Sequence, residues 1–409
     1  MGRFTLHTCE LLYSPDWDLP MVDAAVLVDQ DGVIHGFGDR SGVQGDDAET
    51  YHHQILMPGV VNAHIHVTDG FRPHPVPGGN GLVDWVGKLM PDRNAGLSEQ
   101  ERDAGIRTML ADIRQRGTVA IGEVVNNDRT LDAIWESGLY CRFIFELIGF
   151  REDRVEAALE IADSLETRIR EEEDDAGRVR YANGVHAPYS VSPKLMMAAA
   201  GRGRFVGRYF YQHLAEDPDE RELYENGTGR WREFSEKIGA WESSWNPPGM
   251  SPIRLYDTLG LLANDFVAVH LTDATDEEID LLARRGVKAI FSPTSNLHIT
   301  GRLPDVERIV GAGMTVALGT DGRGSNPDMD VFSEARLLKE RYPEIPSGTW
   351  LRALTSGGAD ILQFSELGRI REKTAPGLVA VEVRHLGGTS LEECERSVLL
   401  NAVSRVRVV

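Results

Sequence analysis

The chain has 409 residues, of which 43 are Lys or Arg and 64 are Asp or Glu, so its formal net charge is −21 at pH 7. A charge of this sign argues against a protein that binds the backbone of a nucleic acid. The composition, 41% apolar and 26% charged, is that of a globular chain and excludes a largely disordered, collagenous or membrane-embedded protein.

The sequence predicts a cytoplasmic protein without a membrane partner. No run approaches the roughly 20 consecutive apolar residues that a membrane span needs, and residues 1–7 lack the apolar core of a signal peptide. Cys9, Cys141 and Cys394 lie far apart and form no C-x-x-C pair, so we interpret them as free thiols in a reducing compartment.

The two ends of the chain carry short alternating strands punctuated by Gly and Asp. These runs are Leu6–Leu12, Ala24–Asp29, Val33–Phe37, Leu378–Val383 and Val398–Val409. We predict that residues 1–55 and 375–409 fold together as a small β-sandwich domain.

Between these ends, eight apolar and β-branched runs recur with helical segments between them. The runs are Leu56–His66, Thr118–Val125, Arg142–Phe150, Val179–His186, Tyr209–His213, Phe266–His270, Lys288–Ser292 and Thr315–Asp321. The clearest helical segments are Ser98–Arg116, Val155–Ile169, Thr275–Arg285 and Asp305–Ala312. Ser98 with Glu101, and Thr275 with Glu278, form the capping-box pattern of a helix start. The acidic run 171–175 is interpreted as a solvated helix end and loop.

Alternating strands and helices indicate an α/β protein with a parallel sheet, and eight such units close into a (β/α)8 TIM barrel. An open doubly wound sheet is the alternative. Most of the eight runs end in a polar residue of catalytic type, which favours a barrel with its site at the C-terminal mouth. We therefore predict a barrel domain over residues 56–374.

His64 and His66 end the first predicted barrel strand. Side chains at positions i and i+2 of a strand point the same way, so both imidazoles face the barrel mouth and can chelate a metal. A lone His-x-His pair can equally be hydrogen-bonded core or surface. His213 and Asp321 end the fifth and eighth strands and strengthen the metal interpretation, because three imidazoles and a carboxylate suit Zn²⁺ or Fe²⁺. No lysine stands at a strand end to bridge two ions, so we expect one metal.

Two further residues complete the predicted chemistry. His270, at the end of the sixth strand, would crowd out water as a further ligand, so we expect it to orient the attacking water; a buried core histidine is the alternative. Glu216 follows His213 by three residues and is expected on the loop, curled back over the site as a proton shuttle. Asp321 is expected to accept a hydrogen bond from the water while it ligates the metal.

These motifs resemble the amidohydrolase superfamily, in its mononuclear deaminase branch. The resemblance rests on Met57–His66, His186–Ser192, His213–Glu216, Ser292–Asn296 and Gly319–Asn326, in the order and spacing of that family. Within the branch the chain resembles deaminases of S-adenosylhomocysteine, methylthioadenosine and, most closely, 6-amino-6-deoxyfutalosine. The segment from Glu225–Trp231 to Leu255–Asp257 looks like the insertion of the aminofutalosine enzymes.

The resemblance implies a metal held by His64, His66, His213 and Asp321, with Glu216 and His270 in the roles above and His186 in contact with purine and ribose. The chain departs from the family in two places: Ser292 stands where many relatives have Cys, and the segment Val67–Arg72 varies among relatives with substrate.

The substrate contacts are less specified by sequence. Asp92 is a candidate for the ribose, and Trp85 either lines the pocket or packs in its amphipathic stretch. The cation expected to meet a substrate carboxylate is Arg72, Arg230 or Arg323.

The sequence therefore predicts hydrolytic deamination of a small-molecule adenine nucleoside, most favourably aminofutalosine, by a zinc (or iron) enzyme that could form a homodimer. The alternatives are a deaminase of S-adenosylhomocysteine, methylthioadenosine or adenosine, and another amidohydrolase acting on guanine, triazine, chlorinated or amide substrates. A catalytically dead barrel is disfavoured by the complete ligand set.

Overall fold

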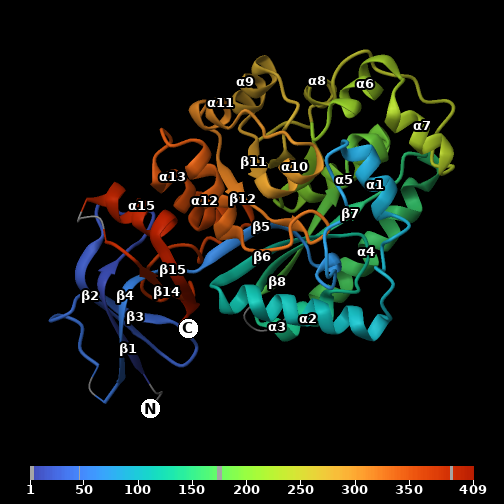
Figure 1. The fold of residues 1–409 in the computed structure, drawn as a ribbon. Helices are drawn as coiled ribbons and strands as arrows, with labels where there is room; N and C mark the ends of the chain where they lie inside the picture. The colour runs from blue at the N-terminus through green and yellow to red at the C-terminus, as the bar shows by residue number, and fades with distance from the viewer. Residues whose placement is uncertain (1–3, 46, 173–176, 387–389) are drawn as a thin grey trace. The chain divides into compact units, whose positions relative to one another are not determined.

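The structure is a computed structural model that describes residues 4–45, 47–172, 177–386 and 390–409 (Figure 1). The chain divides into two compact units. One comprises the residues up to Ala63, Ala111–Ile121 and the residues from Asp330 on, and the other comprises His64–Leu110 and Gly122–Met329. The domain limits expected from the sequence stay a prediction.

The first unit contains a mixed six-stranded sheet built from both ends of the chain, which confirms that strands from the two termini fold together as predicted. Its strands are β1 (Thr5–Leu12), β2 (Met21–Val28), β3 (Ile34–Asp39), β4 (Glu49–Pro58), β14 (Leu378–Val383) and β15 (Ala402–Arg407), in the order β15-β14-β4-β1-β2-β3. β1 and β4 are parallel, and the other neighbouring pairs are antiparallel. Leu12, Val26, Ile34, Leu56 and Leu378 lie in its buried core.

The last predicted strand begins later than the sequence suggests. Residues 398–401, expected in a strand, belong to helix α15 (Leu391–Asn401). Ser390 caps this helix by accepting a hydrogen bond from the backbone N–H of Glu393, and Val398 and Leu399 are buried. The cap and the buried helical face outweigh the β-branched composition of the tail.

The second sheet contains nine strands in the order β12-β11-β10-β9-β8-β7-β6-β5-β13. The strands are β5 (Val60–His66), β6 (Thr118–Val125), β7 (Tyr140–Leu147), β8 (Val179–Val185), β9 (Phe210–Leu214), β10 (Phe266–His270), β11 (Lys288–Phe291), β12 (Val316–Leu318) and β13 (Asp321–Gly322). The pairs with defined register are parallel, from β7 through β12 and between β13 and β5. β12 and β13 are separated by two residues, so this one segment pairs with β11 on one side and with β5 on the other. The curled, TIM-like sheet confirms the predicted fold class.

The first predicted barrel strand, Leu56–His66, is divided in the structure. β4 ends at Pro58 and β5 begins at Val60. A Cβ on Gly59 would lie 2.1 Å from a Val119 methyl, so only glycine fits where the chain passes from one sheet to the next.

Helices follow the parallel strands along the chain (Figure 1). The α-helices are α1 (Leu82–Leu89), α2 (Glu99–Gln115), α3 (Leu131–Ser137), α4 (Val155–Glu171), α5 (Pro193–Phe205), α6 (Pro218–Asn226), α7 (Arg230–Lys237), α8 (Pro252–Thr258), α9 (Asp276–Arg285), α10 (Pro293–Ile299), α11 (Val306–Gly311), α12 (Val331–Arg341), α13 (Ser347–Leu354), α14 (Ser356–Ile361) and α15. Short 3-10 helices cover η1 (Val67–Asp69), η2 (Glu152–Arg154) and η3 (Pro188–Ser190). Both predicted capping boxes are present, at Ser98 with Glu101 and at Thr275 with Glu278.

The acidic run that follows α4 is only partly described by the structure. α4 ends at Glu171, and residues 173–175 of the acidic run that follows lie outside the described residues. Within the described ranges, no helix combines the length and apolar character that crossing a membrane requires.

Candidate active site

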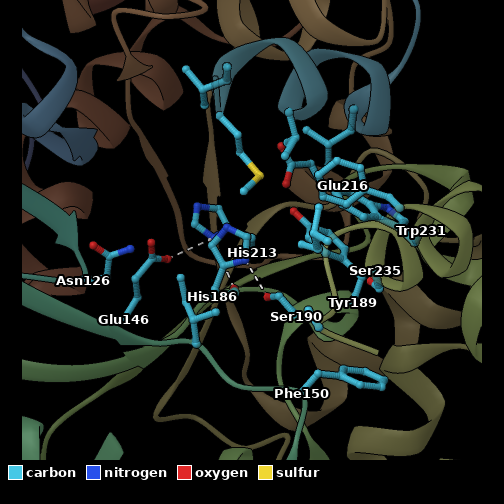
Figure 2. Close-up of a pocket in the computed structure, with 18 of the residues that line it drawn as sticks. Asn126, Glu146, Phe150, His186, Tyr189, Ser190, His213, Glu216, Trp231 and Ser235 are labelled. Carbon is cyan, nitrogen blue, oxygen red and sulfur yellow. Dashed lines mark hydrogen bonds and ion pairs between the residues drawn. The ribbon is translucent and has the colours of Figure 1, made fainter. Parts of the chain in front are cut away.

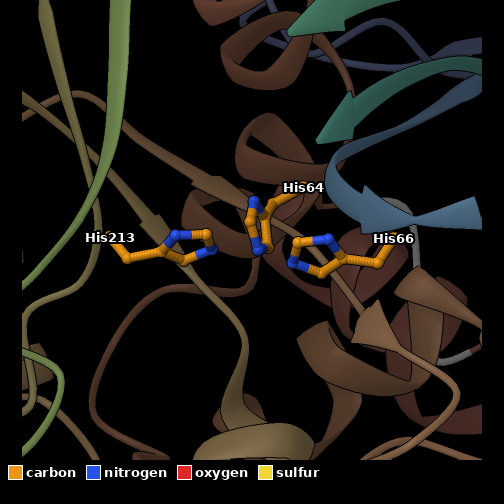
Figure 3. A group of neighbouring side chains, drawn as sticks. All are labelled: His64, His66 and His213. Atoms are coloured by element: carbon orange, nitrogen blue, oxygen red, sulfur yellow. The ribbon is translucent and has the colours of Figure 1, made fainter. Parts of the chain in front are cut away.

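Three histidines from two strands converge at the C-terminal ends of the parallel sheet. His64 and His66 end β5, and His213 lies on β9. One nitrogen from each ring lies within 4.8 Å of the corresponding atoms of the other two. Figure 3 shows the three imidazoles turned toward a common point, the arrangement expected of metal ligands.

Backbone carbonyls hold two of these rings by the nitrogen that faces away from the centre. His66 Nδ1 donates to the carbonyl oxygen of Val124 at 2.9 Å, and His213 Nδ1 donates to that of His186 at 3.2 Å. Each bond places the proton on Nδ1 and leaves Nε2 free to ligate. Burial lowers the pKa of His64 and of His213, which favours the neutral form that a metal requires.

Asp321, at the start of β13, supplies a carboxylate to the same point. Its Oδ1 lies 3.5 Å from His64 Nε2 and 3.3 Å from His66 Nε2. Ser295 Oγ donates to the other oxygen, Oδ2, at 2.5 Å. Although burial opposes ionisation, the two imidazoles hold the pKa of Asp321 well below its usual range.

The donor set fits one divalent ion. Both ring nitrogens of His64 are buried and have no hydrogen-bond partner among the described residues. An unpartnered buried imidazole is costly, and a metal would remove that cost. Three imidazoles and one carboxylate are ligand types that zinc accepts in enzymes.

Glu216 and His270 face each other beside this centre. His270 Nε2 lies 3.5 Å from Glu216 Oε1, and both side chains are buried. The amide of Asn296 donates to His270 Nδ1 at 3.0 Å, so the ring hydrogen is carried on Nε2. Burial lowers the pKa of His270 to about 3, which makes it a neutral hydrogen-bond donor. Burial, with Asp321 and Glu220 nearby, raises the pKa of Glu216 well above its usual range, as suits a proton carrier.

The backbone is unusual at three of these strand ends. Ala215, His270 and Asp321 have φ values of 51°, 79° and 63°, in the left-handed region that residues other than glycine seldom adopt. Such conformations cost roughly 1–3 kcal/mol each and concentrate at functional sites. They turn the chain sharply where it leaves the strands.

A cavity of about 570 Å³ opens above the centre. Its polar end includes His66, His213, His270, Glu216 and Asp321. Its apolar walls come from α1, α7 and the loops after β7 and β8, and they comprise Leu82, Trp85, Val86, Leu89, Met90, Ile148, Phe150, Tyr189, Trp231, Phe234 and Ile238. Figure 2 shows Tyr189 and Trp231 on the side of Glu216, and their rings stack with centroids 3.6 Å apart. The size suits a nucleoside or a somewhat larger molecule.

The predicted substrate contacts are distributed unevenly about this cavity. His186 and Trp85 line it, whereas Asp92, Arg72 and Arg230 are not among its lining residues. Arg72 is buried and binds Asp69 and Asp92, with its Nη1 3.0 Å from Asp92 Oδ2. Arg230 donates to the carbonyl oxygen of Asn80, and Arg323 donates to that of Gly70. The cations that line the cavity are Arg151 and Arg154 instead.

The sequence assigned no role to three residues that the structure places in the site. Glu146, next to the last residue of β7, lines the cavity, Asn296 donates to the His270 ring, and Trp231 stacks on Tyr189. A signal for Glu146 was present, because it is an acidic residue near the end of an otherwise apolar run. The stacked pair joins α7 to the loop after β8, and no spacing rule predicts such a contact.

Comparison with known proteins gives relatives along most of the chain. A 5-methylthioadenosine/S-adenosylhomocysteine deaminase from Dictyoglomus thermophilum is 28% identical over 342 residues, which are 81% of this chain and 74% of that protein. The protein of that name from Halobacterium salinarum is 29% identical over 381 residues, 89% of this chain and 81% of its own length.

Solved structures share the fold. Helicobacter pylori aminofutalosine deaminase in complex with methylthio-coformycin superposes with a TM-score of 0.83 at 20% identity, over 99% of this chain and 100% of that one. A zinc-bound adenosine deaminase from Xanthomonas campestris gives 0.76 at 24% identity, over 97% and 89% of the two chains. Residues 55–404 match the Amidohydrolase family as a whole. The chain is therefore a member of the amidohydrolase family, as its motifs predicted.

Proposed function

We propose that this protein is a metal-dependent hydrolytic deaminase of an adenine nucleoside. The observation that carries the proposal is the convergence of His64, His66, His213 and Asp321 next to the Glu216–His270 pair, at the polar end of a nucleoside-sized cavity. The methylthioadenosine and S-adenosylhomocysteine deaminases related to the chain support the same reaction class.

The four ligands would hold one Zn²⁺, with Fe²⁺ as the alternative. When bound, the ion supplies Lewis acidity that lowers the pKa of a water molecule to about 7. His270 donates a hydrogen bond from its Nε2–H to the oxygen of that water. This bond orients the water toward C6 of the purine. Glu216 takes a proton from the water and gives it to the ring nitrogen N1 as the oxygen attacks C6.

The reaction then needs a second proton transfer. Asp321 accepts a hydrogen bond from the hydroxyl that C6 has gained. Glu216, which is a carboxylate again after protonating N1, takes the proton of this hydroxyl and delivers it to the amino group. The C6–N bond breaks and ammonia leaves, with the oxygen retained as the carbonyl of the product. The raised pKa of Glu216 suits it to both donating and accepting in this sequence.

We propose 6-amino-6-deoxyfutalosine as the substrate, converted to futalosine and ammonia as in menaquinone biosynthesis. Beyond the sequence resemblance, this substrate suits a cavity that extends from the polar end between aromatic walls and has Arg151 and Arg154 in its lining. Arg151 is paired with Asp153 at 2.7 Å, so Arg154 is the better partner for the aromatic carboxylate. Methylthioadenosine, which has no carboxylate, and S-adenosylhomocysteine are the alternative substrates.

The test is ammonia release from the zinc-loaded protein with aminofutalosine, S-adenosylhomocysteine, methylthioadenosine, adenosine, guanine and cytosine. Glu216→Gln should abolish release from the preferred substrate while leaving its binding and the zinc content unchanged. If no adenine nucleoside released ammonia, the proposal would be refuted, and amide and chlorotriazine substrates would be tested next.

Arg154→Met distinguishes aminofutalosine from methylthioadenosine as the substrate. We expect a rise in KM of about 10-fold or more for aminofutalosine, because a charged hydrogen bond is lost, and no rise for methylthioadenosine. Arg230→Met is the matched control, since Arg230 lies outside the cavity lining. Equal effects of the two variants would contradict the role given to Arg154.

A further inference from the structure

Glu146, at the end of β7, is a cavity carboxylate without a role in the chemistry described above. Its side chain is only 7% exposed, and it lies among the residues that line the cavity. Its Oε2 is buried and accepts no hydrogen bond from any described residue. His213 Nδ1 lies 3.8 Å from this oxygen, and that nitrogen already donates to the His186 carbonyl oxygen. Figure 2 shows Glu146 beside His213 and His186.

A neighbouring glutamate shows what a satisfied buried carboxylate looks like in this fold. Glu123, on the adjacent strand β6, accepts from the backbone N–H of Val67 at 2.7 Å and from Thr130 Oγ1 at 3.1 Å. Both of its oxygens are thus occupied by the protein. A buried carboxylate oxygen left without a donor is costly, so Glu146 requires a donor that arrives from the cavity.

Several other acceptors in the cavity lining already have partners in the protein or belong to the reacting centre. Asp69 receives a hydrogen bond from Arg72, and the side-chain oxygen of Asn126 receives one from Asn127. Ser190 Oγ is bonded to His186 and Ala187, while Asp321 and Glu216 belong to the reacting centre. Most of the remaining wall is apolar and cannot accept a hydroxyl hydrogen.

The position of Glu146 indicates which part of a ligand it meets. His213 turns Nε2 toward the metal centre and Nδ1 toward Glu146, so Glu146 lies one imidazole width away from the reacting atoms. Glu216 follows the end of β9, and Figure 2 shows it on the other side of His213 from Glu146. His270, at the end of β10, lies 3.5 Å from Glu216 Oε1. A purine whose C6 reaches the centre would present its sugar, and not its ring, to Glu146.

We infer that Glu146 accepts hydrogen bonds from the sugar hydroxyls of the nucleoside and selects for substrates that carry them. This inference rests on the proposed function and replaces Asp92, which lies outside the cavity lining, as the acidic residue that recognises the ribose. Two vicinal hydroxyls can donate to the two oxygens of one carboxylate, which makes the contact charge-assisted and geometrically specific.

The experiment measures binding, so that it does not depend on turnover. Calorimetric titrations of adenosine, 2′-deoxyadenosine and 3′-deoxyadenosine are made into zinc-loaded Glu216→Gln and into the Glu146→Gln/Glu216→Gln double variant. We expect at least one deoxynucleoside to bind about 10- to 100-fold more weakly than adenosine in the presence of Glu146. In the double variant the affinity for adenosine should fall by the same factor, and the affinity for that deoxynucleoside should not fall further. Glu156→Gln, at an exposed position of α4, is the matched control.

The outcomes separate this inference from the proposed function. Ammonia release without discrimination against either deoxynucleoside overturns the role of Glu146 and leaves the deaminase intact. Discrimination that depends on Glu146, with no ammonia released by the wild-type protein, retains sugar recognition and refutes the deaminase. Absence of adenosine binding overturns the inference. A second equivalent of bound zinc that disappears in Glu146→Gln would also overturn it, because the carboxylate would then hold a cation.

Discussion

Gly319 offers the sharpest test of how the fold sets the metal geometry. It lies between β12 and β13, against the backbone of His64. A Cβ at this position would stand 2.5 Å from His64 Cβ, 2.6 Å from its carbonyl oxygen and 2.8 Å from its amide nitrogen. Because Cβ contacts below 3.0 Å essentially do not occur, Gly319→Ala must move the β12–β13 segment and His64 apart by at least 0.5 Å (3.0 − 2.5).

This displacement is large for a metal ligand, since ligand distances tolerate only about 0.2 Å. We expect Gly319→Ala to weaken zinc binding by about 10- to 100-fold, as disturbed ligand orientation does elsewhere. The crowding should also lower the free energy of unfolding by roughly 1–3 kcal/mol.

Competition with a chromophoric chelator measures the zinc affinity, and urea unfolding of the metal-free protein measures the stability. Gly311→Ala is the control, because a Cβ at Gly311 in α11 meets nothing within 4 Å. Zinc affinity within twofold of the wild type in Gly319→Ala would show that β5 can move without cost, and would refute the reasoning.

Two further substitutions test neighbouring parts of the site. Burial raises the pKa of Glu220 from 4.5 to about 8, so the folded protein holds an extra proton in that interval and its unfolding free energy falls as pH rises through it. Glu220→Gln keeps an acceptor for the Ala215 N–H but cannot ionise. Its unfolding free energy, measured with urea, should therefore rise relative to that of the wild type by at most roughly 5 kcal/mol between pH 4.5 and pH 8. A difference that does not change with pH would contradict this expectation. Asn296→Ala frees the His270 ring and should lower kcat about 10-fold with little change in KM, whereas a change confined to KM would assign Asn296 to substrate binding.

The fold was predictable because local signals agreed along the whole chain. The strand limits of β6 and β10 match the prediction residue for residue, and the caps at Ser98 and Thr275 define the starts of α2 and α9. Period-2 alternation also placed His64 and His66 on one face, and the structure brings His213 and Asp321 to the same point. Alternation within a strand and the shared mouth of a barrel are enough to predict that convergence.

Contacts that join distant loops could not be read from spacing. Arg72 follows the histidine pair and was a candidate for the substrate carboxylate, yet it is buried against Asp69 and Asp92. Arg154 lines the cavity although nothing in its local sequence distinguishes it from other surface arginines. The path of the loop after β7 brings Arg154 to the cavity, and sequence periodicity does not predict the path of a loop.

The same limit explains why the reaction class is better specified than the substrate. Ligands and proton carriers lie at or just after strand ends, where hydrogen bonds to main-chain carbonyls and sharp backbone turns at Ala215, His270 and Asp321 hold them in place. The walls that would meet the rest of a substrate come from α1, α7 and the loop after β7, whose positions depend on contacts such as the Tyr189–Trp231 stack. A substitution at a strand end should therefore alter turnover of every substrate by a similar factor. A substitution in these walls should instead change the ratio of kcat/KM between substrates, so the two classes of variant can be separated by comparing two nucleosides.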